Sequence, residues 1–228
     1  IEIHNRPIYM LYLMQSLKNR NYILYFHNDP LTMSGSRSIS ERIFLLKNCF
    51  KIIFNSNWSK KQFLYGMSDE FNNSEKLIVI NQSAKKNKVN LKFKKKIITF
   101  VGKLNKAKGY DIFGNSIVRI LNKHSDWSSI VVGDEPRDKI KFKHKKLKSL
   151  GFLNHNQVLN IYKKTSIAVI CSRWEEPFGR TSLEASANGC AVIITSKGGL
   201  PETITDAKIL KNLTVNDLKK TLNLLIRN

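Results

Sequence analysis

Short apolar runs alternate with amphipathic stretches along the chain, and this pattern predicts a repeated strand–helix order. In the first 80 residues, runs rich in Ile, Tyr and Phe predict strands, and apolar residues at helical spacing predict helices. Strands that alternate with helices imply a parallel sheet with helices on both faces. The expected strands are 1–3, 22–26, 51–54 and 77–80, and the expected helices are 7–18, 40–48 with Ser40 as the cap, and 59–65.

A lysine-rich stretch, residues 82–96, interrupts this alternation, which then resumes. We interpret residues 85–96 as a basic linker between a partial N-terminal domain, 1–84, and a C-terminal domain, 97–228. Both read as Rossmann-like, so the predicted fold class is α/β with two Rossmann-like domains. The second part is expected to hold strands at 97–101, 129–132, near 151–153, 166–171 and 191–194, helices ending at Leu121 and covering 156–163 and 215–226, and a basic helix or loop over 137–148.

The most informative segment lies between two carboxylates, Glu176 and Glu184, that have seven residues between them. Glu176 falls in a loop broken by Pro177 and Gly179, and Glu184 is expected in the first turn of the next helix. In open α/β folds, a turn at the carboxyl end of a strand is where ligands bind. Free N–H groups at a helix start suit an anion, and a carboxylate suits hydroxyls, so the segment fits a sugar nucleotide.

The run from 176 to 194, followed by the Gly-Gly-Leu-Pro-Glu turn at 198–202, resembles the nucleotide-sugar site of GT-B retaining glycosyltransferases of family four. The likeness is most specific over 100–204. It implies a GT-B fold whose N-terminal domain is incomplete, because family members carry strands before residue 1 and a helix after residue 228. The chain by itself is therefore expected to show little or no transferase activity.

The resemblance also implies a hexosyltransferase. It would move a sugar from a nucleoside-diphosphate sugar to a hydroxyl of a glycan or lipid-linked acceptor, with the anomeric configuration retained. The usual roles of family members favour cell-envelope polysaccharide or lipopolysaccharide synthesis.

Two acids and one loop receive roles from this resemblance. Glu184 would accept hydrogen bonds from the ribose hydroxyls, and Glu176 would face the transferred sugar and steady its positive charge. Backbone amides of Phe178, Gly179 and Arg180 would approach the sugar or phosphate. From the residues alone, Glu184 also fits a helix capping box that starts at position 181, and Glu176 also fits a solvated loop acid.

The turn that starts at Gly102 would hold the diphosphate between Lys103 and Lys108. The family usually has Arg at the first of these positions, so Lys103 departs from its pattern and offers a point charge in place of a fork. In a lysine-rich chain, both can also be ordinary surface residues. Phe152 and Leu153 match the position that holds the base, with a role in the core as the alternative.

Two histidines end the first two expected strands. The resemblance places His27 near the bond that breaks and His4 on the acceptor side, although a loop histidine is more often structural. Arg137 fits a contact with base or phosphate and a solvent-facing role equally well. His124, His144 and His155 are interpreted as surface residues.

Two other functions stay open, one suggested by the charge and one by the fold. The formal net charge is +22, which reflects compositional bias or a surface for polyanions and acidic lipids. One alternative is therefore a non-enzymatic polyanion- or nucleic-acid-binding protein, but aromatic residues are not interleaved with the basic ones, and no specific nucleic-acid partner is expected. The other alternative is a GT-B sugar epimerase or phosphorylase.

The remaining expectations concern cofactors and location. Lysines would take over the charge stabilisation that Mg²⁺ provides elsewhere, so neither a cofactor nor an essential metal is expected. Cys171 and Cys190 lie in apolar runs and are interpreted as reduced thiols, which favours the cytoplasm. No apolar run approaches the ~20 residues of a membrane span. A weak peripheral contact with the inner face of an anionic membrane is expected from the lysines.

Overall fold

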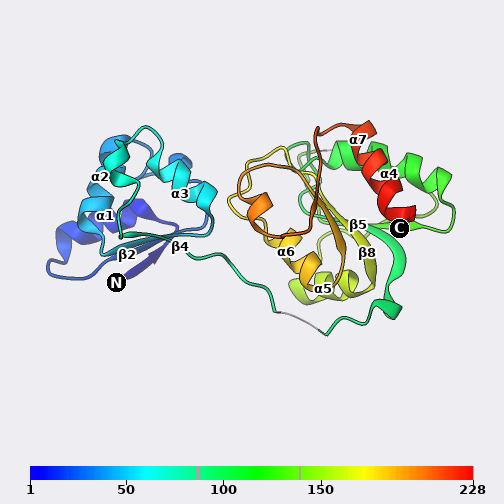
Figure 1. Ribbon diagram of the computed structural model, residues 1–228, viewed down its shortest axis with the longest axis horizontal. Coiled ribbons are helices and arrows are strands. Elements are labelled where there is room, and N and C mark those ends of the chain that lie inside the picture. Colours follow the sequence, from blue (N-terminus) through cyan, green and yellow to red (C-terminus); the bar gives the residue numbers. More distant parts are fainter. Residues whose placement is uncertain (86–87, 139, 228) are drawn as a thin grey trace. The chain divides into compact units, whose positions relative to one another are not determined.

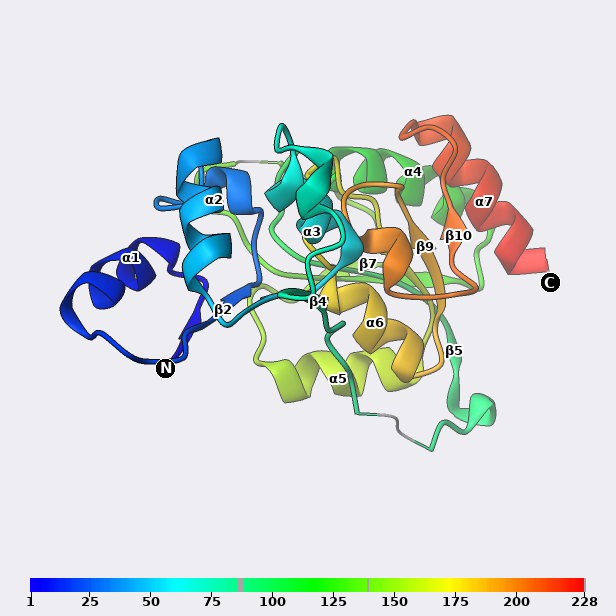
Figure 2. The same ribbon diagram turned by 60° about the vertical axis from the view of Figure 1, so that its left-hand side comes forward.

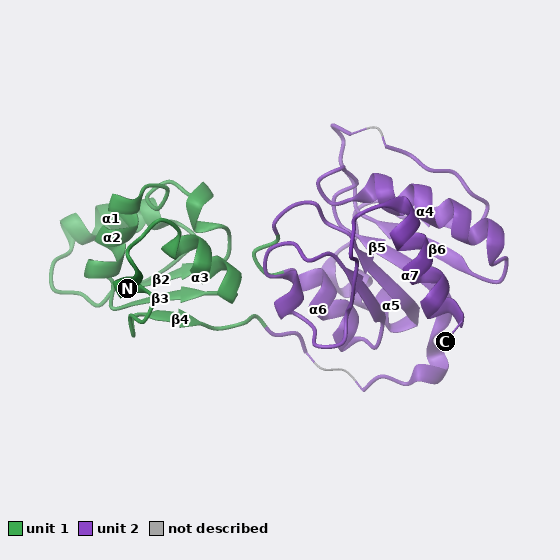
Figure 3. Ribbon diagram, turned by 45° about the horizontal axis from the view of Figure 1, so that its top comes forward, with its two compact units in different colours: residues 1–82, 176–178 green, residues 83–175, 179–228 purple. Residues whose placement is uncertain are grey.

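The computed structural model describes residues 1–85, 88–138 and 140–227, and its chain forms two compact units (Figures 1 and 3). Unit 1 consists of residues 1–82 and 176–178, and unit 2 consists of 83–175 together with the chain from 179 onward. The tripeptide 176–178 thus packs with unit 1, although its neighbours on both sides belong to unit 2. This division is made by contacts alone, and the domain boundaries 1–84, 85–96 and 97–228 stay a prediction.

Unit 1 is a four-stranded parallel sheet in the order β1-β2-β3-β4. Its strands follow the apolar runs that the sequence shows, and β3 has the bounds expected for it. Helix α2 is capped by Ser38, whose side chain and Glu41 form a capping box, so the prediction of Ser40 as the cap is wrong. The elements are β1 (Glu2–His4), α1 (Pro7–Ser16), β2 (Ile23–Phe26), α2 (Ile39–Asn48), β3 (Lys51–Phe54), α3 (Asn57–Leu64) and β4 (Leu77–Val79).

The three helices of unit 1 pack on one face of its sheet, which corrects the expectation of helices on both faces. Met10, Leu45 and Phe63, one from each helix, share a single core with the β2 residues Leu24 and Phe26. The physical reason is the strand order. Each strand is added next to the previous one in the same direction, and right-handed crossovers then place every helix on the same side.

Unit 2 is a six-stranded parallel sheet in the order β10-β9-β8-β5-β6-β7. The chain starts in the middle at β5, runs outward through β6 to β7, and then returns to the other side of β5 as β8. The change of direction between β5 and β8 makes this the topological switch point of the sheet. The elements are β5 (Lys95–Val101), α4 (Tyr110–Lys123), β6 (Ser128–Val132), β7 (Leu147–Ser149), α5 (His155–Lys164), β8 (Thr165–Ile170), α6 (Arg180–Ala187), β9 (Ala191–Ile194), β10 (Lys208–Ile209) and α7 (Val215–Arg227).

Because the winding reverses, helices cover both faces of the unit 2 sheet (Figure 2). Helices α4 and α7 bury Phe113, Ile117 and Leu222 against one face, and α5 and α6 bury Tyr162 and Ala185 against the other. The strands supply both cores, since successive side chains point to opposite faces. All carboxyl ends of the strands lie along one edge.

One expected strand of unit 2 lies elsewhere in the structure: β7 covers Leu147–Ser149 and not residues 151–153, which form the turn after it. For 137–148 a basic helix or loop was expected. The described residues between 137 and 146 form a loop, and Lys139 lies outside the described residues. In the described parts of the chain, we find no helix with both the length and the apolarity needed to cross a membrane.

Candidate functional site

The loops that follow β5 and β8 meet at the switch point of unit 2. The Ala107 carbonyl accepts hydrogen bonds from the backbone N–H groups of Arg173 (2.8 Å) and Trp174 (3.1 Å). The Arg173 guanidinium pairs with both oxygens of Asp111, at 2.7 and 2.9 Å. Burial by itself raises the pKa of Asp111, but Arg173 outweighs it and holds this pKa below its ordinary value. The two loops are thereby held as one support for a ligand.

Helices α4 and α6 both begin at this edge behind a left-handed glycine. Gly109 (φ 73°) and Gly179 (φ 103°) are the N-caps, and neither helix has a side-chain cap. A Cβ on Gly109 would lie 1.9 Å from the Cys171 carbonyl oxygen, so no larger residue fits there. The first N–H groups of both helices thus lack a capping side chain, which suits a phosphate.

Glu184 lies inside α6 and caps nothing. The N-cap is Gly179, so Glu184 is in the second helical turn, and both the first-turn placement and the capping-box alternative are wrong. Its side chain is only 10% exposed. Its Oε1 lies 3.1 Å from His155 Nε2 and 3.2 Å from Arg180 Nη2. A buried carboxylate that is held in place by two basic groups is well suited to accept hydrogen bonds from a ligand.

His155 is the site residue that the sequence interpretation missed, because it was assigned to the surface. Its side chain is indeed 57% exposed, yet its ring reaches Glu184. The position of His155 in the sequence could have indicated that it belongs to the site. His155 is the first residue of α5, and it follows the Phe152–Leu153 turn by two residues. Loops at the carboxyl ends of neighbouring strands converge, and a histidine that opens the following helix lies close to that edge.

A cavity of about 270 Å³ brings four predicted residues together. Gly102 and Lys103 come from the β5 turn, and Phe152 and Leu153 come from the turn after β7. Phe152 is 76% exposed, so the core alternative is wrong for it, while Leu153 is partly buried against the core. The cavity lining is mostly apolar, and an exposed aromatic ring beside it is suited to stack on a base. The other lining residues are Val101, Val132, Gly133, Asp134 and Val158.

Lys108 does not line that cavity. It is half-buried at the end of the β5 turn, where its N–H donates to Asn105 Oδ1 at 3.0 Å. Arg137 points to its own neighbour, since its guanidinium contacts Glu135 at 2.8 Å and lowers the pKa of Glu135 to about 2. The Arg137 side chain is also 80% exposed, as its solvent-facing alternative predicts, and a contact with base or phosphate stays a prediction.

The segment between the two site acids divides across the units. Glu176 and Phe178, which is 3% exposed, pack with unit 1, whereas Gly179, Arg180 and Glu184 belong to unit 2. The preceding residue, Glu175, stays in unit 2. It accepts a hydrogen bond from the Gly198 N–H at 2.6 Å and pairs with Lys197 at 2.9 Å. Glu175 therefore ties the loop after β8 to the Gly-Gly-Leu-Pro-Glu turn.

The two candidate histidines lie together in unit 1. His4 Nδ1 and His27 Nε2 are 3.0 Å apart, at the ends of β1 and β2, and the two rings stack beside Tyr25. Burial, and to a lesser degree the His4 ring, lower the pKa of His27. The lowered pKa favours the neutral form of the His27 ring. Its carbonyl accepts a hydrogen bond from Asn55 Nδ2 at 3.0 Å.

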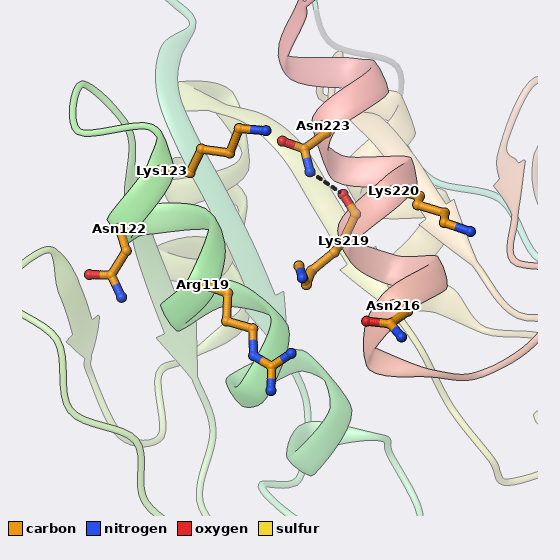
Figure 4. Close-up of a pocket in the computed structure, with 7 residues that line it drawn as sticks. All are labelled: Arg119, Asn122, Lys123, Asn216, Lys219, Lys220 and Asn223. Carbon is orange, nitrogen blue, oxygen red and sulfur yellow. Dashed lines mark hydrogen bonds between the residues drawn. The ribbon is translucent and has the colours of Figure 1, made fainter.

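Basic charge outside this site gathers in a groove of about 570 Å³ between α4 and α7 (Figure 4). Four cationic side chains line it together with three asparagines, and none of its lining residues is acidic. The residues are Arg119, Asn122, Lys123, Asn216, Lys219, Lys220 and Asn223. In the described residues, no group of three or more His, Cys, Asp or Glu side chains is placed to hold a metal ion.

The sequence of this chain is similar to those of several known proteins. Spore coat protein SA of Bacillus subtilis is 30% identical over 127 residues, which are 50% of this chain and 34% of that protein. The lipopolysaccharide core biosynthesis mannosyltransferase LpsB of Rhizobium meliloti is 28% identical over 137 residues, 55% of this chain and 39% of that protein. The matched stretch thus spans well under two thirds of the length of these curated relatives.

The fold agrees with a solved structure. The Anabaena protein HepE in complex with UDP and glucose superimposes with a TM-score of 0.76 at 16% identity, covering 100% of this chain and 68% of that one. The predicted fold class, α/β with two Rossmann-like units of the GT-B type, is confirmed. The model of the family described as "Glycosyl transferases group 1" matches residues 81–228. The chain therefore belongs to the group 1 glycosyl transferases.

Proposed function

We propose that the protein moves a hexosyl group from a nucleoside-diphosphate sugar to an acceptor hydroxyl with retention of configuration. The observation that supports this most is the arrangement at the β5/β8 switch point of a family member. There, buried Glu184 and the cavity lined by Gly102, Lys103, Phe152 and Leu153 lie at the carboxyl ends of the same parallel sheet. These groups match the hydroxyls, phosphates and base of such a donor.

In the proposed reaction, the bond between the anomeric carbon and the diphosphate oxygen breaks, and a bond to the acceptor oxygen forms. The acceptor proton leaves with the released diphosphate. Lys103, Lys108 and the N–H groups at the starts of α4 and α6 stabilise the negative charge that develops on the leaving group, so we propose no cofactor and no essential metal. Glu184 holds the ribose. Glu176 steadies the oxocarbenium-like sugar, His27 faces it, and His4 lies on the acceptor side.

Product analysis tests this proposal against its rivals. The purified full-length protein would be incubated with UDP-, GDP- and ADP-sugars, saccharide acceptors and EDTA. Transfer gives a glycoside and a nucleoside diphosphate in equal amounts, with retained configuration at the new bond. An epimerase gives a new sugar without a glycoside, a phosphorylase requires phosphate, and a polyanion-binding protein gives no turnover. Loss of transfer with EDTA would contradict the assignment of the charge to lysines.

Replacing Lys103 and Lys108 together by alanine is expected to weaken nucleoside diphosphate binding about tenfold or more, because both cations face phosphate. The affinity for the corresponding nucleoside should change little. Calorimetric titration of both ligands measures the two effects. The matched control is Lys123→Ala together with Lys163→Ala, which removes the same charge from the last turns of α4 and α5 in unit 2. Equal losses for nucleoside and diphosphate would rule out the clamp.

Glu176→Gln is expected to lower the turnover of the full-length protein about tenfold while nucleotide affinity stays the same. The amide keeps the size of the side chain but loses the charge that opposes the positive sugar in the transition state. Steady-state kinetics and titration of the same protein sample separate the two quantities. Glu175→Gln serves as the control from the neighbouring position. A Glu176 variant with the rate of the native protein would place this acid outside the reaction.

Envelope glycan synthesis on the cytoplasmic face of a membrane is part of the proposal. The similarity to the lipopolysaccharide core biosynthesis mannosyltransferase of Rhizobium meliloti supports the envelope role. We expect weak, salt-sensitive binding to anionic vesicles, because lysines near such a surface contribute about 1 kcal/mol each within a Debye length. Co-sedimentation of Lys219→Gln/Lys220→Gln, from the α4–α7 groove, should show weaker binding than the native protein. Binding that ignores lipid charge and salt would contradict this account.

A further inference from the structure

A polar cavity lies in unit 1, and none of its lining residues is assigned to the donor nucleotide. It measures about 380 Å³, which falls within the ~300–1,000 Å³ of ordinary ligand sites. It opens where β1 and β2 end, next in sequence to the His4–His27 pair. Its lining residues are Asn5, Arg6, Pro7, Ile8, Asn28, Thr32, Met33, Ser34 and Arg37.

The charged groups of this cavity are all positive. Arg6 and Arg37 are its ionisable lining residues, and neither guanidinium pairs with a carboxylate in the described part of the chain. Two acids close to Arg37 in sequence serve local structure. Asp29 accepts the Leu31 N–H at 3.0 Å, and Glu41 accepts the Ser38 N–H at 2.9 Å. Two positive charges therefore share one cavity without a counter-charge from the protein.

Both guanidiniums are oriented by the backbone. Arg6 Nη1 donates to the Asn5 carbonyl at 3.0 Å, and Arg37 donates through Nε and Nη2 to the Thr32 carbonyl at 3.4 and 3.3 Å. Each guanidinium carries five N–H donors, so these contacts fix the side chain and leave other donors to bind a ligand. An arginine that is already oriented loses less conformational entropy when it binds a planar or tetrahedral anion.

The walls of the cavity are fixed as well. Asn5 adopts a left-handed backbone conformation (φ 59°), and its Oδ1 accepts the N–H groups of His27 (3.2 Å) and Asn28 (3.1 Å). A Cβ on Gly35, the residue after Ser34, would lie 2.5 Å from the Ile8 nitrogen, so the loop approaches the start of α1 closely. The ends of β1 and β2 and the loop that ends at Arg37 are thus held before any ligand arrives.

We infer that this cavity binds a phosphate group and that the acceptor of the reaction is a phosphate-bearing molecule. Paired guanidinium forks bind phosphate oxygens in bidentate fashion, and Asn28, Thr32 and Ser34 add neutral donors for ester oxygens or hydroxyls. The assignment to the acceptor rests on the proposed function, which places the donor diphosphate on unit 2. A phosphate site on unit 1, beside the two histidines, then serves the other substrate.

Titration of the ¹⁵N-labelled chain with inorganic phosphate, followed by NMR at constant ionic strength, tests the cavity directly. The signals of Asn5, Asn28 and Ser34 should shift saturably with phosphate and not with chloride. Arg6→Gln/Arg37→Gln should weaken this binding at least tenfold, whereas Arg20→Gln, an exposed arginine of the same unit, should leave it unchanged. Native-like signal dispersion shows that each variant is folded. Equal binding in the double variant, or equal shifts with chloride, would overturn the inference.

Two further arms identify the source of the phosphate. A saccharide phosphate and phosphatidylcholine vesicles containing phosphatidic acid are each offered to the native chain and to Arg6→Gln/Arg37→Gln. Arginine-dependent binding of the first indicates a phosphorylated glycan, and of the second a lipid-linked acceptor. Arginine-independent binding of both, or binding of neither, contradicts the inference.

The outcome is separable from that of the proposed function. Lys103→Ala/Lys108→Ala should keep the phosphate response of unit 1 and lose nucleoside diphosphate binding. A chain that binds phosphate in unit 1 but no nucleotide would refute the proposed function and leave the cavity assignment standing. A chain that binds nucleotide without the arginine-dependent phosphate response would refute the cavity assignment alone.

Discussion

Replacing Lys94 by methionine is expected to lower the free energy of unfolding of unit 2 by about 3 kcal/mol. The Lys94 ammonium donates to three backbone carbonyls, those of Tyr162 (2.8 Å), Thr165 (2.8 Å) and Asn188 (2.6 Å). These carbonyls close the C-terminal ends of α5 and α6, where a cation also opposes the helix dipoles. Methionine keeps the length of the side chain but removes the charged donor from all three carbonyls.

Urea unfolding followed by circular dichroism measures this effect. The matched control is Lys92→Met, which removes an exposed lysine two positions earlier in the chain. We expect that control to change stability by less than about 0.5 kcal/mol. If both variants unfold at the same urea concentration as the native chain, Lys94 is an ordinary surface lysine and the account of how α5 and α6 are joined to β5 is wrong.

Glu184→Ala is expected to weaken nucleoside diphosphate binding by about 2 kcal/mol, or roughly 30-fold, because the ribose hydroxyls lose a charged acceptor. The stability of the fold should change little, since Glu184 does not cap α6 and its basic neighbours His155 and Arg180 are largely exposed to water. Calorimetric titration and thermal unfolding of the same variant separate the two effects.

Asp206→Asn is the control for the loss of one negative charge, from an exposed turn of unit 2. His155→Gln should weaken binding in the same direction as Glu184→Ala but by less, because it removes only one of the groups that hold the carboxylate. A Glu184 variant that melts earlier yet binds nucleotide with native affinity would assign this acid to structure and not to ligand binding.

The sequence was sufficient to predict features that depend on local pattern. Apolar runs marked the strands, and the strand–turn–helix order located the ligand edge around Gly102 and Gly179. It could not predict which turn of α6 holds Glu184, because Thr181 and Glu184 have the spacing of a capping box. In the structure, the N-cap is Gly179, two residues before Thr181, and its left-handed backbone conformation is not visible in the sequence.

Contacts between residues far apart in the sequence could not be predicted from local sequence patterns. Lys94 has the same surroundings in sequence as the other lysines of 82–96, and its partners are 68 to 94 residues away. His155 likewise reaches an acid 29 residues later. The single-sided cover of the unit 1 sheet follows from the order of its strands, which helix and strand signals leave open. Each of these features depends on the topology of the fold and not on residue type.

The central claim, that unit 2 binds the nucleoside diphosphate of a sugar donor, is tested most directly by calorimetric titration of this chain with UDP, GDP and ADP. Each titration is paired with the matching nucleoside and with pyrophosphate at constant ionic strength. We predict that at least one nucleoside diphosphate binds saturably with one site per chain, more tightly than its nucleoside and more tightly than pyrophosphate. A folded chain that binds none of the three saturably, or binds pyrophosphate as tightly as every nucleotide, would contradict the account.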